Sequence, residues 1–368
     1  MTNLDWPEEL AELAGLAREV GLQVLGPAAR EAEAGGVPPQ VWDTVFGTGL
    51  TTPIAEALGG GGVLSALEEV VAAENLAHGD PGIALAALRS GAAALLVGAH
   101  GTTEQRETLR SVDAAWRGSV AIYEGFGRSP REYETTVAVH ANGIRVRGRK
   151  ESVAFASQAA DIVVVGNDPD GGGLRAVLVA GDAPGVAVIP DPPGLALGAV
   201  PTATLELDVT VPVTALVGGG DAEPAALACS VERIRLVPAA VLVGCAQRAI
   251  EYAADYAKDR VAFGRPIVGF QGVSFLLSEA VMRLSAARHS IHDAASRLDA
   301  GDDTTSELVS EAVSCAAEAA TQSTRDAVQV LGGHGFIKDH PVELWYRSAA
   351  ALAVCDFDLL RSAFQPAL

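Results

Sequence analysis

The pattern of apolar residues changes twice along the chain, and this change constrains its fold more than any other feature. From residue 5 to about 116, apolar residues recur at three- and four-residue steps between Gly/Pro clusters, which is typical of packed helices. From about 117 to 218 the apolar segments are short, β-branched and bounded by turns, as in ADIVVVGN and TLELDVTVP. Such segments favour a small antiparallel β-domain.

After GGGDAEP the helical pattern returns in four long segments with short connections, near residues 223–259, 272–300, 305–331 and 341–354. This layout fits an antiparallel four-helix bundle. A chain of 368 residues also exceeds one ordinary core. We therefore predict an α+β multidomain protein with an N-terminal helical domain (1–116), a central antiparallel β-domain (117–218) and a C-terminal four-helix bundle (219–368).

Charge and cysteine usage exclude several classes of function. The net charge of −20 argues against nucleic acid or an anionic membrane as the main partner. The apolar runs are too short or too interrupted to span a bilayer, and the acidic start MTNLDWPEELAEL is unlike a signal peptide. The four cysteines are widely spaced, with no CxxC or Cys/His metal pattern. We expect a cytoplasmic protein with reduced cysteines and no metal site.

Two stretches of the expected bundle carry more than packing residues. DRVAFGRPIVGFQGV (259–273) lies between two helices and combines Arg260 with aromatic, amide and glycine residues. AVQVLGGHGFIKDHPVELWYR (327–347) ends a helix at a glycine pair, and such a pair lets a ligand approach the backbone closely. Arg260 supplies a fixed cation for phosphate. For either stretch alone, a helix C-cap and a surface charge are the favoured explanation, but the presence of both stretches in this order in one bundle favours a ligand site.

The sequence resembles the acyl-CoA dehydrogenases over essentially the whole chain. The most specific matches are RLVPAAVLVGCAQRAIEYAADYAKDRVAFGRPIVGFQGV and QVLGGHGF, and GIRVRGRKESVAFASQAADIVVVG is similar to the β-domain of that family. The resemblance implies the helical, β, helical fold, usually as a tetramer. It also implies oxidation of an acyl-CoA thioester to the 2,3-enoyl-CoA, with FAD as cofactor and an electron-transfer flavoprotein as electron acceptor.

Asp356 occupies the position of the catalytic base in this resemblance. The family places its commonest base, a glutamate, at a fixed distance after the glycine pair, and counting from Gly333 reaches Asp356. Aspartate is one methylene shorter, and a base must come within roughly 3 Å of the proton it removes. The family follows its base with glycine and threonine, whereas Phe357 and Asp358 follow here. A solvated helix end is an equally good interpretation of these aspartates.

The β-domain departs from the family where it would enclose the flavin ring. YEGFGRSPREYE (123–134) stands in place of the TEPxAGSD-like loop, with Glu124 as the clear match. In ESVAFAS (151–157), Ser152 stands where the family has a large aromatic residue, and Ala154 where it has a hydroxyl. Alanine cannot donate a hydrogen bond to the flavin, and serine removes most of the apolar cover. The ring side of the cofactor site is therefore predicted to be degraded.

The positions that grip the other half of the cofactor are retained. In this family a neighbouring chain holds the pyrophosphate and adenosine of each FAD. The resemblance assigns this role here to eight residues, among which Ala262 is the weakest match: Arg260, Ala262, Phe263, Phe270, Gln271, Gln329, Gly332 and Gly333. Random drift would not be expected to spare one half of the site only.

Glu232 and Arg235 match positions that contact the substrate and its CoA part in the family. A solvated i,i+3 pair on a helix is at least as good an explanation. Some members of the family take their catalytic base from this helix, but that position is Ile234 here. As a candidate base, Glu232 therefore ranks well below Asp356. His334 is interpreted as a loop histidine, because the family varies there.

Three functional interpretations follow from the sequence. The first is a subunit that gives the adenosine-side half of the FAD site to a complete homologous partner, as a heterotetramer. The second is a self-sufficient dehydrogenase that uses Asp356. The third is a non-catalytic acyl-CoA-binding or scaffold homologue. The identity of the acyl-CoA is open, and a bulky acyl group is suggested by analogy alone.

Overall fold

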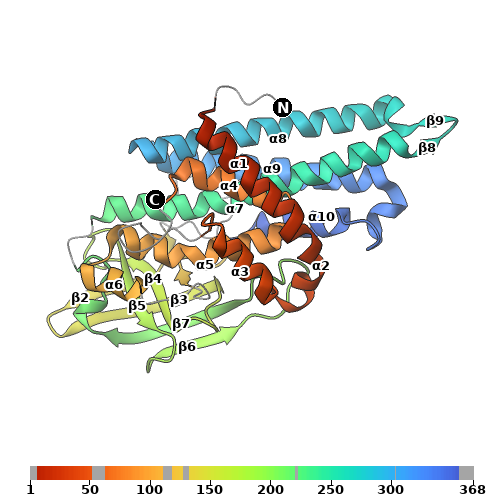
Figure 1. Cartoon of the computed structure of the whole chain (residues 1–368). Coiled ribbons are helices and arrows are strands. Elements are labelled where there is room, and N and C mark those ends of the chain that lie inside the picture. The colour runs from red at the N-terminus through yellow and green to blue at the C-terminus, as the bar shows by residue number, and fades with distance from the viewer. Residues whose placement is uncertain are drawn as a thin grey trace.

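The computed structural model describes residues 6–51, 63–110, 118–126, 132–219, 223–302 and 304–355. Helices, strands and again helices follow one another along these residues, and this order confirms the predicted fold class. The helices form the upper part of the molecule in Figure 1, and the sheet lies beneath one end of them.

Six α-helices form the N-terminal part of the described chain: α1 (Glu8–Val20), α2 (Gly26–Gly35), α3 (Pro39–Gly47), α4 (Ala66–Ala77), α5 (Pro81–His100) and α6 (Thr103–Arg110). A π-helical turn, Gly21–Leu25, joins α1 to α2. Ser65 begins α4 with a capping box, in which its side chain accepts from the Glu68 N–H while the Glu68 carboxylate accepts from the Ser65 N–H.

Glycines allow the N-terminal helices to approach their neighbours at backbone distance. A Cβ on Gly79, directly after α4, would lie 1.8 Å from the carbonyl oxygen of Gly21. A Cβ on Gly244 of α7 (Pro224–Asp259) would lie 2.0 Å from the carbonyl oxygen of Glu74. No side chain fits at either position without a backbone shift, so these glycines set the spacing of α4 from both neighbours.

The central part is a mostly antiparallel, seven-stranded sheet in the order β1-β4-β2-β3-β7-β6, with β5 paired to β4. Its strands are β1 (Ser119–Ala121), β2 (Thr136–His140), β3 (Gly143–Ala154), β4 (Asp161–Asn167), β5 (Leu174–Ala180), β6 (Val186–Pro190) and β7 (Thr202–Val211). The sheet departs from a purely antiparallel one at β4, with which both β1 and β2 pair in the parallel sense. β1 is three residues long, too short for alternation to reveal it in the sequence.

The C-terminal helices are α7, α8 (Gln271–Ala300), α9 (Thr305–Leu331) and α10 (Val342–Leu352). Their bounds agree with the four segments predicted from periodicity to within two residues. A hairpin of β8 (Val261–Ala262) and β9 (Arg265–Pro266) joins α7 to α8. This hairpin projects beyond the end of the bundle opposite the sheet (Figure 1).

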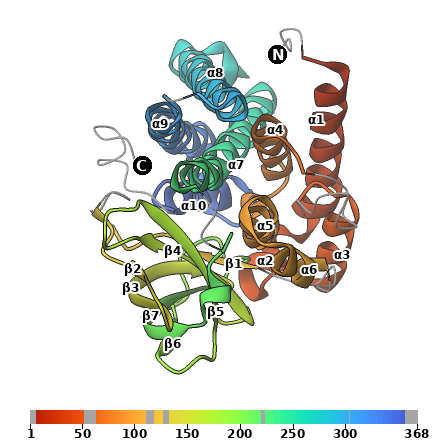
Figure 2. The same cartoon turned by 90° about the vertical axis from the view of Figure 1, so that its left-hand side faces the viewer.

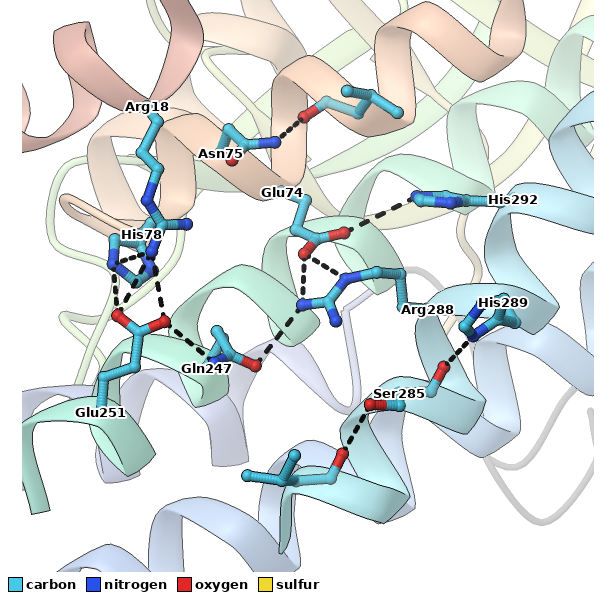
Figure 3. A network of polar contacts seen from close by, with 12 residues as sticks. Arg18, Glu74, Asn75, His78, Gln247, Glu251, Ser285, Arg288, His289 and His292 are labelled. Carbon is cyan, nitrogen blue, oxygen red and sulfur yellow. Dashed lines mark hydrogen bonds and ion pairs between the residues drawn. The ribbon is translucent and has the colours of Figure 1, made fainter. Parts of the chain in front are cut away.

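A chain of polar contacts ties α1 and α4 to the bundle (Figure 3). The Glu74 carboxylate pairs with Arg288 of α8 at 2.6 Å. Glu251 of α7 pairs with Arg18 at 3.2 Å and with His78 at 3.0 Å. Burial alone would raise the pKa of Glu251, but hydrogen bonds and charge from His78, Gln247 and Arg18 lower it to about 2. The N-terminal helices are thus held to the bundle by charge as well as by apolar packing.

Helix α5 lies in the interior, against α7 and β1 (Figure 2). Among the described helices it alone is long and apolar enough to cross a membrane, and 83% of its apolar window is buried inside the chain. It is therefore the core helix around which the three parts of the chain meet.

The predicted domain limits, 1–116, 117–218 and 219–368, stay a prediction. The last described helix before the sheet ends at Arg110, and β1 begins at Ser119. β7 ends at Val211, and α7 begins at Pro224.

Candidate functional site

Most of the predicted cofactor residues lie at the end of the bundle that carries the β8–β9 hairpin. Arg260 follows the last turn of α7 and is exposed, with its N–H donating to the Tyr256 carbonyl at 2.8 Å. Ala262 is half-buried and pairs with Arg265 across the hairpin. Phe263 at the tip is 98% exposed and adopts a left-handed φ of 53°.

The start of α8 supports the hairpin with an aromatic contact. The Phe270 ring stands edge-on to Phe263, with centroids 6.2 Å apart. The Arg265 guanidinium lies 4.1 Å from the centroid of the same ring, a cation–π contact. Gln271, the first residue of α8, is exposed beside it. The hairpin thus presents a guanidinium, an amide and aromatic faces to the outside of the chain.

The glycine pair lies at the same end of the bundle. Gln329 is exposed in the last turn of α9, and a 3₁₀ turn, Gly332–Phe336, follows. A Cβ on Gly332 or Gly333 would meet nothing within 4 Å, so both backbones face open space. His334, beside the pair, is hydrogen-bonded at 2.8 Å to Tyr256 in the last turn of α7.

These residues suit the phosphate and adenosine half of a dinucleotide. Arg260 supplies positive charge, Gln271 and Gln329 supply amides, and the glycines leave the backbone open to a ligand. The site lies at an exposed end of the described part of the chain. A ligand held here would therefore need a second surface to enclose it, which another chain would supply.

The ring-side positions line a separate cavity, at the seam of α5, the sheet and the end of α10. Lining residues include Leu85, Arg89 and Ala92 of α5, Ile122 and Tyr123 after β1, Glu151 to Ala154 of β3, and Cys355. Its volume is about 30 Å³, room for a few water molecules at most. Pockets that bury a cofactor or drug-sized ligand enclose roughly 300–1,000 Å³. As described, the cavity does not fit an isoalloxazine ring.

The backbone of β3 is irregular where the ring would lie. Its register against β7 shifts between Lys150 and Val153, and Ser152 in the bulge has a φ of 52°. Phe155, at a φ of 59°, turns into the helical core, 2% exposed, against Trp42. Left-handed conformations cost non-glycine residues about 1–3 kcal/mol. Two such residues, Ser152 and Phe155, flank the segment that contains Ala154, which lines the cavity and has no hydroxyl group.

Behind this cavity, Glu124 and Lys150 form a buried ion pair at 2.8 Å. The Glu124 carboxylate also accepts from the Glu134 and Thr135 N–H groups, and Lys150 donates to the Ile122 carbonyl. Burial lowers the pKa of Lys150 to about 8, against the opposing charge of Glu124. Glu124, the one residue of its loop that matches the family, thus serves to fix β3 and the chain after β1.

Glu232 and Arg235 lie side by side within α7, 2% and 1% exposed. Their side chains pair at 2.6 Å, and the Ser306 hydroxyl donates to the second Glu232 oxygen at 2.8 Å. The pair is buried, unlike the solvated pair considered as its alternative. Its role in substrate binding stays a prediction.

Asp356, Phe357 and Asp358 lie outside the described residues, so the predicted base also stays a prediction. Cys355, the residue before it, lines the cavity.

Sequence reasoning missed Arg89 and Asp80. Arg89 is the single charged residue within PGIALAALRSGAAALLVGA, and a lone charge inside an apolar helix was the available signal. Asp80 is 4% exposed and caps α5 by accepting from the Ile83 N–H at 2.7 Å. Burial raises the pKa of Asp80 to about 6.

Comparisons with known proteins agree with this fold. The sequence profile of the acyl-CoA dehydrogenase N-terminal domain matches residues 7–111, and that of the C-terminal domain matches residues 225–356. An acyl-CoA dehydrogenase of Bacillus subtilis is 37% identical over 239 residues, which cover 63% of this chain and 62% of that relative. A second B. subtilis protein, the probable acyl-CoA dehydrogenase YngJ, is 29% identical over 96% of this chain and 95% of its own.

Solved structures show the same fold. Butyryl-CoA dehydrogenase from Megasphaera elsdenii superposes with a TM-score of 0.84 at 24% identity, covering 98% of each chain. The FAD complex of PigA superposes with a TM-score of 0.86 at 21% identity, covering 98% of this chain and 97% of PigA. A helical domain, a central sheet and a helical bundle in this order make up the acyl-CoA dehydrogenase fold. The two profiles together span more than half of the chain, and the chain belongs to the acyl-CoA dehydrogenase family.

Proposed function

We propose that this chain is a subunit of an acyl-CoA dehydrogenase that gives the adenosine-side half of the FAD site to a homologous, catalytically complete partner. One observation carries the proposal. The predicted adenosine-side residues are accessible together at one end of the bundle, whereas the ring-side cavity has a volume of about 30 Å³. The match to the first curated relative spans less than two-thirds of that relative, so activity, substrate and partners are all proposed here.

Each residue at the exposed end has a proposed role. Arg260 would neutralise pyrophosphate charge, and Gln271 and Gln329 would hydrogen-bond along the cofactor. Gly332 and Gly333 would let the cofactor approach the backbone. The aromatic faces of Phe263 and Phe270 would cover the cofactor from water, with Ala262 leaving room beside them.

The reaction proposed for the assembly is the 2,3-dehydrogenation of an acyl-CoA thioester in the cytoplasm. When bound, FAD would accept the β-hydrogen as hydride, and an electron-transfer flavoprotein would then take the electrons. The partner's own carboxylate would remove the α-proton, so Asp356 would not be needed for turnover. Neither nucleic acid nor a membrane is proposed as a partner, which accords with the net charge of −20.

Pairing with an unlike partner follows from the asymmetry between the two ends of the chain. In a homo-oligomer, every accessible adenosine grip would face a closed ring cavity. In a heterotetramer, each grip would face the partner's complete ring pocket and give one good FAD site per unlike pair. The domain limits 1–116, 117–218 and 219–368 are proposed for the same chain.

Co-expression with a complete homologue, followed by counting flavins per chain from absorbance and protein mass, tests this proposal. We expect one FAD per unlike pair and a nearly colourless chain when it is purified alone. One FAD per chain in a purified homo-oligomer that turns over acyl-CoA would contradict the proposal.

A further inference from the structure

We propose that Arg89 closes the ring-side cavity of this chain by filling it, and that the cavity in this state holds neither a flavin ring nor an acyl chain. The inference deepens the proposed function, on which it rests, because it names the residue that closes the unused half of the chain. It concerns the chain alone, so it can be tested without the partner.

The first support is the position of Arg89 on α5. Sixteen residues of this helix are buried, all of them aliphatic or small, and Arg89 stands half-buried among them. Arg89 projects from this helix into the cavity wall, and its Nη2 is inaccessible to solvent. Burial lowers the pKa of Arg89, against the charge of Glu69 and Cys355. Part of the guanidinium therefore lies inside the chain, although the residue as a whole is half-buried.

The second support is a mismatch between the cavity's walls and its volume. Ser152 and Ala154 are small, and the neighbouring walls are aliphatic side chains such as Leu85, Ile122 and Val153. Small wall residues should leave a large space, yet only about 30 Å³ remains. Arg89 has the longest side chain among the lining residues, and in this proposal it takes up the space that the small residues would otherwise leave.

The third support is the chemistry of the fit. An acyl chain or a flavin ring placed here would have to displace the Arg89 guanidinium or lie against it. Displacing a buried charge without giving it new partners is costly, and a neutral alkyl group offers none. The side chain thus excludes apolar ligands both by its volume and by its charge.

The test is calorimetric titration of the full-length chain, purified alone, with butyryl-CoA. We expect at most weak binding by the wild type and at least tenfold tighter binding by Arg89→Ala. Arg89→Ser serves as a second opened variant in case the alanine variant does not fold, and folding is checked by circular dichroism and thermal melting. Arg149→Ala, an exposed arginine on the adjacent strand β3, is the matched control and should bind as the wild type does.

Two further variants separate filling from other roles. Arg89→Met keeps nearly the whole length without the charge, so it should bind more tightly than the wild type but clearly less tightly than Arg89→Ala. Equal binding by Arg89→Met and Arg89→Ala would overturn the proposal that bulk closes the cavity. The proposal would also be overturned if folded Arg89→Ala and Arg89→Ser bound butyryl-CoA with the affinity of the wild type. Tighter binding of glutaryl-CoA than of butyryl-CoA by the wild type, lost in Arg89→Ala, would overturn it by making Arg89 a carboxylate ligand.

The outcome is distinguishable from a failure of the proposed function. A heterotetramer without FAD would refute the shared cofactor site, whatever the titration shows. A closed cavity in Arg89→Ala would refute the role of Arg89 and leave flavin sharing intact.

Discussion

The two halves of the predicted cofactor site differ in almost every physical respect. The adenosine side lies on a projecting hairpin and a helix end, with polar and aromatic side chains in solvent. The ring side lies at the seam of three parts of the chain, closed to about 30 Å³ and backed by a buried ion pair. Solvent-facing residues contribute little to folding, so the match of the adenosine-side residues to the family pattern favours a role in binding. The ring-side residues instead contribute to packing.

The largest effect is expected from a change in the buried ion pair on the ring side. Lys150→Met should lower the free energy of unfolding by about 3–5 kcal/mol, because it leaves the Glu124 carboxylate buried without its cation. Arg149→Met, its neighbour on the exposed face of β3, should cost less than about 1 kcal/mol, as exposed pairs usually do. Urea denaturation of both variants measures the difference. Equal losses would mean that the ion pair does not stabilise this side.

The second prediction concerns Asp80, the buried cap of the helix that carries Arg89. Because burial raises the pKa of Asp80 from 3.8 to about 6, its contribution to stability is greatest when it is protonated and falls as the pH rises through this window. A shift of about two units corresponds to roughly 3 kcal/mol. Asp80→Asn keeps a capping oxygen and should therefore be more stable than the wild type at pH 7.

The difference between Asp80→Asn and the wild type should shrink to near zero at pH 4, where the wild-type carboxyl is protonated. Denaturant melts of both proteins at pH 4 and pH 7 provide the measurement. A constant difference at both pH values would refute the titration of Asp80.

The third prediction concerns FAD binding by Arg260 on the exposed adenosine side. Arg260→Ala should weaken FAD binding to the assembled complex by about 1.5–3 kcal/mol, the usual loss for a hydrogen bond to a charged group. This corresponds to roughly 10- to 150-fold in affinity. The free energy of unfolding of the Arg260→Ala chain should hardly change, since Arg260 is exposed. Arg297→Ala, an exposed arginine at the other end of α8, is the control. Flavin fluorescence during dilution of the complex reports the affinity.

The smallest expected effect is at the predicted base. Asp356→Asn should leave turnover of the complex within about twofold, because the partner would supply the carboxylate. If this chain instead provides the base, the loss should be on the order of 10²- to 10⁴-fold. Steady-state rates with a saturating acyl-CoA distinguish the two outcomes, and a loss of that size would return the catalytic role to Asp356.

The sequence predicted the long elements well because each carries a strong period. The limits of α7, α8 and α9 follow from apolar spacing and from Pro or Gly at their ends, and β3 and β7 follow from alternation. Short β1 was not predicted, and neither was its parallel pairing with β4, which depends on contacts distant in the chain.

The candidate site was predictable to a different degree on its two sides. Arg260, Gln271 and Gln329 could be identified from local motifs, because a loop between helices exposes whatever it carries. The closure of the ring side was not visible, because it depends on Arg89 of α5 reaching a cavity also lined by Ser152 of β3. The left-handed backbone at Ser152 and Phe155 likewise has no sequence signal, since neither residue is glycine.

The exposed hairpin also bears on how the cell would handle this chain. Val261, Phe263, Phe275 and Met282, on the hairpin and on α8, all present large apolar side chains to solvent. Apolar groups exposed in this way promote aggregation in an orphan subunit and attract chaperones and proteases. A chain made in excess of its partner would be removed rather than accumulate. In the proposed heterotetramer, balanced synthesis of the two subunits, as from one transcript, would therefore be as necessary to the enzyme as any residue of its site.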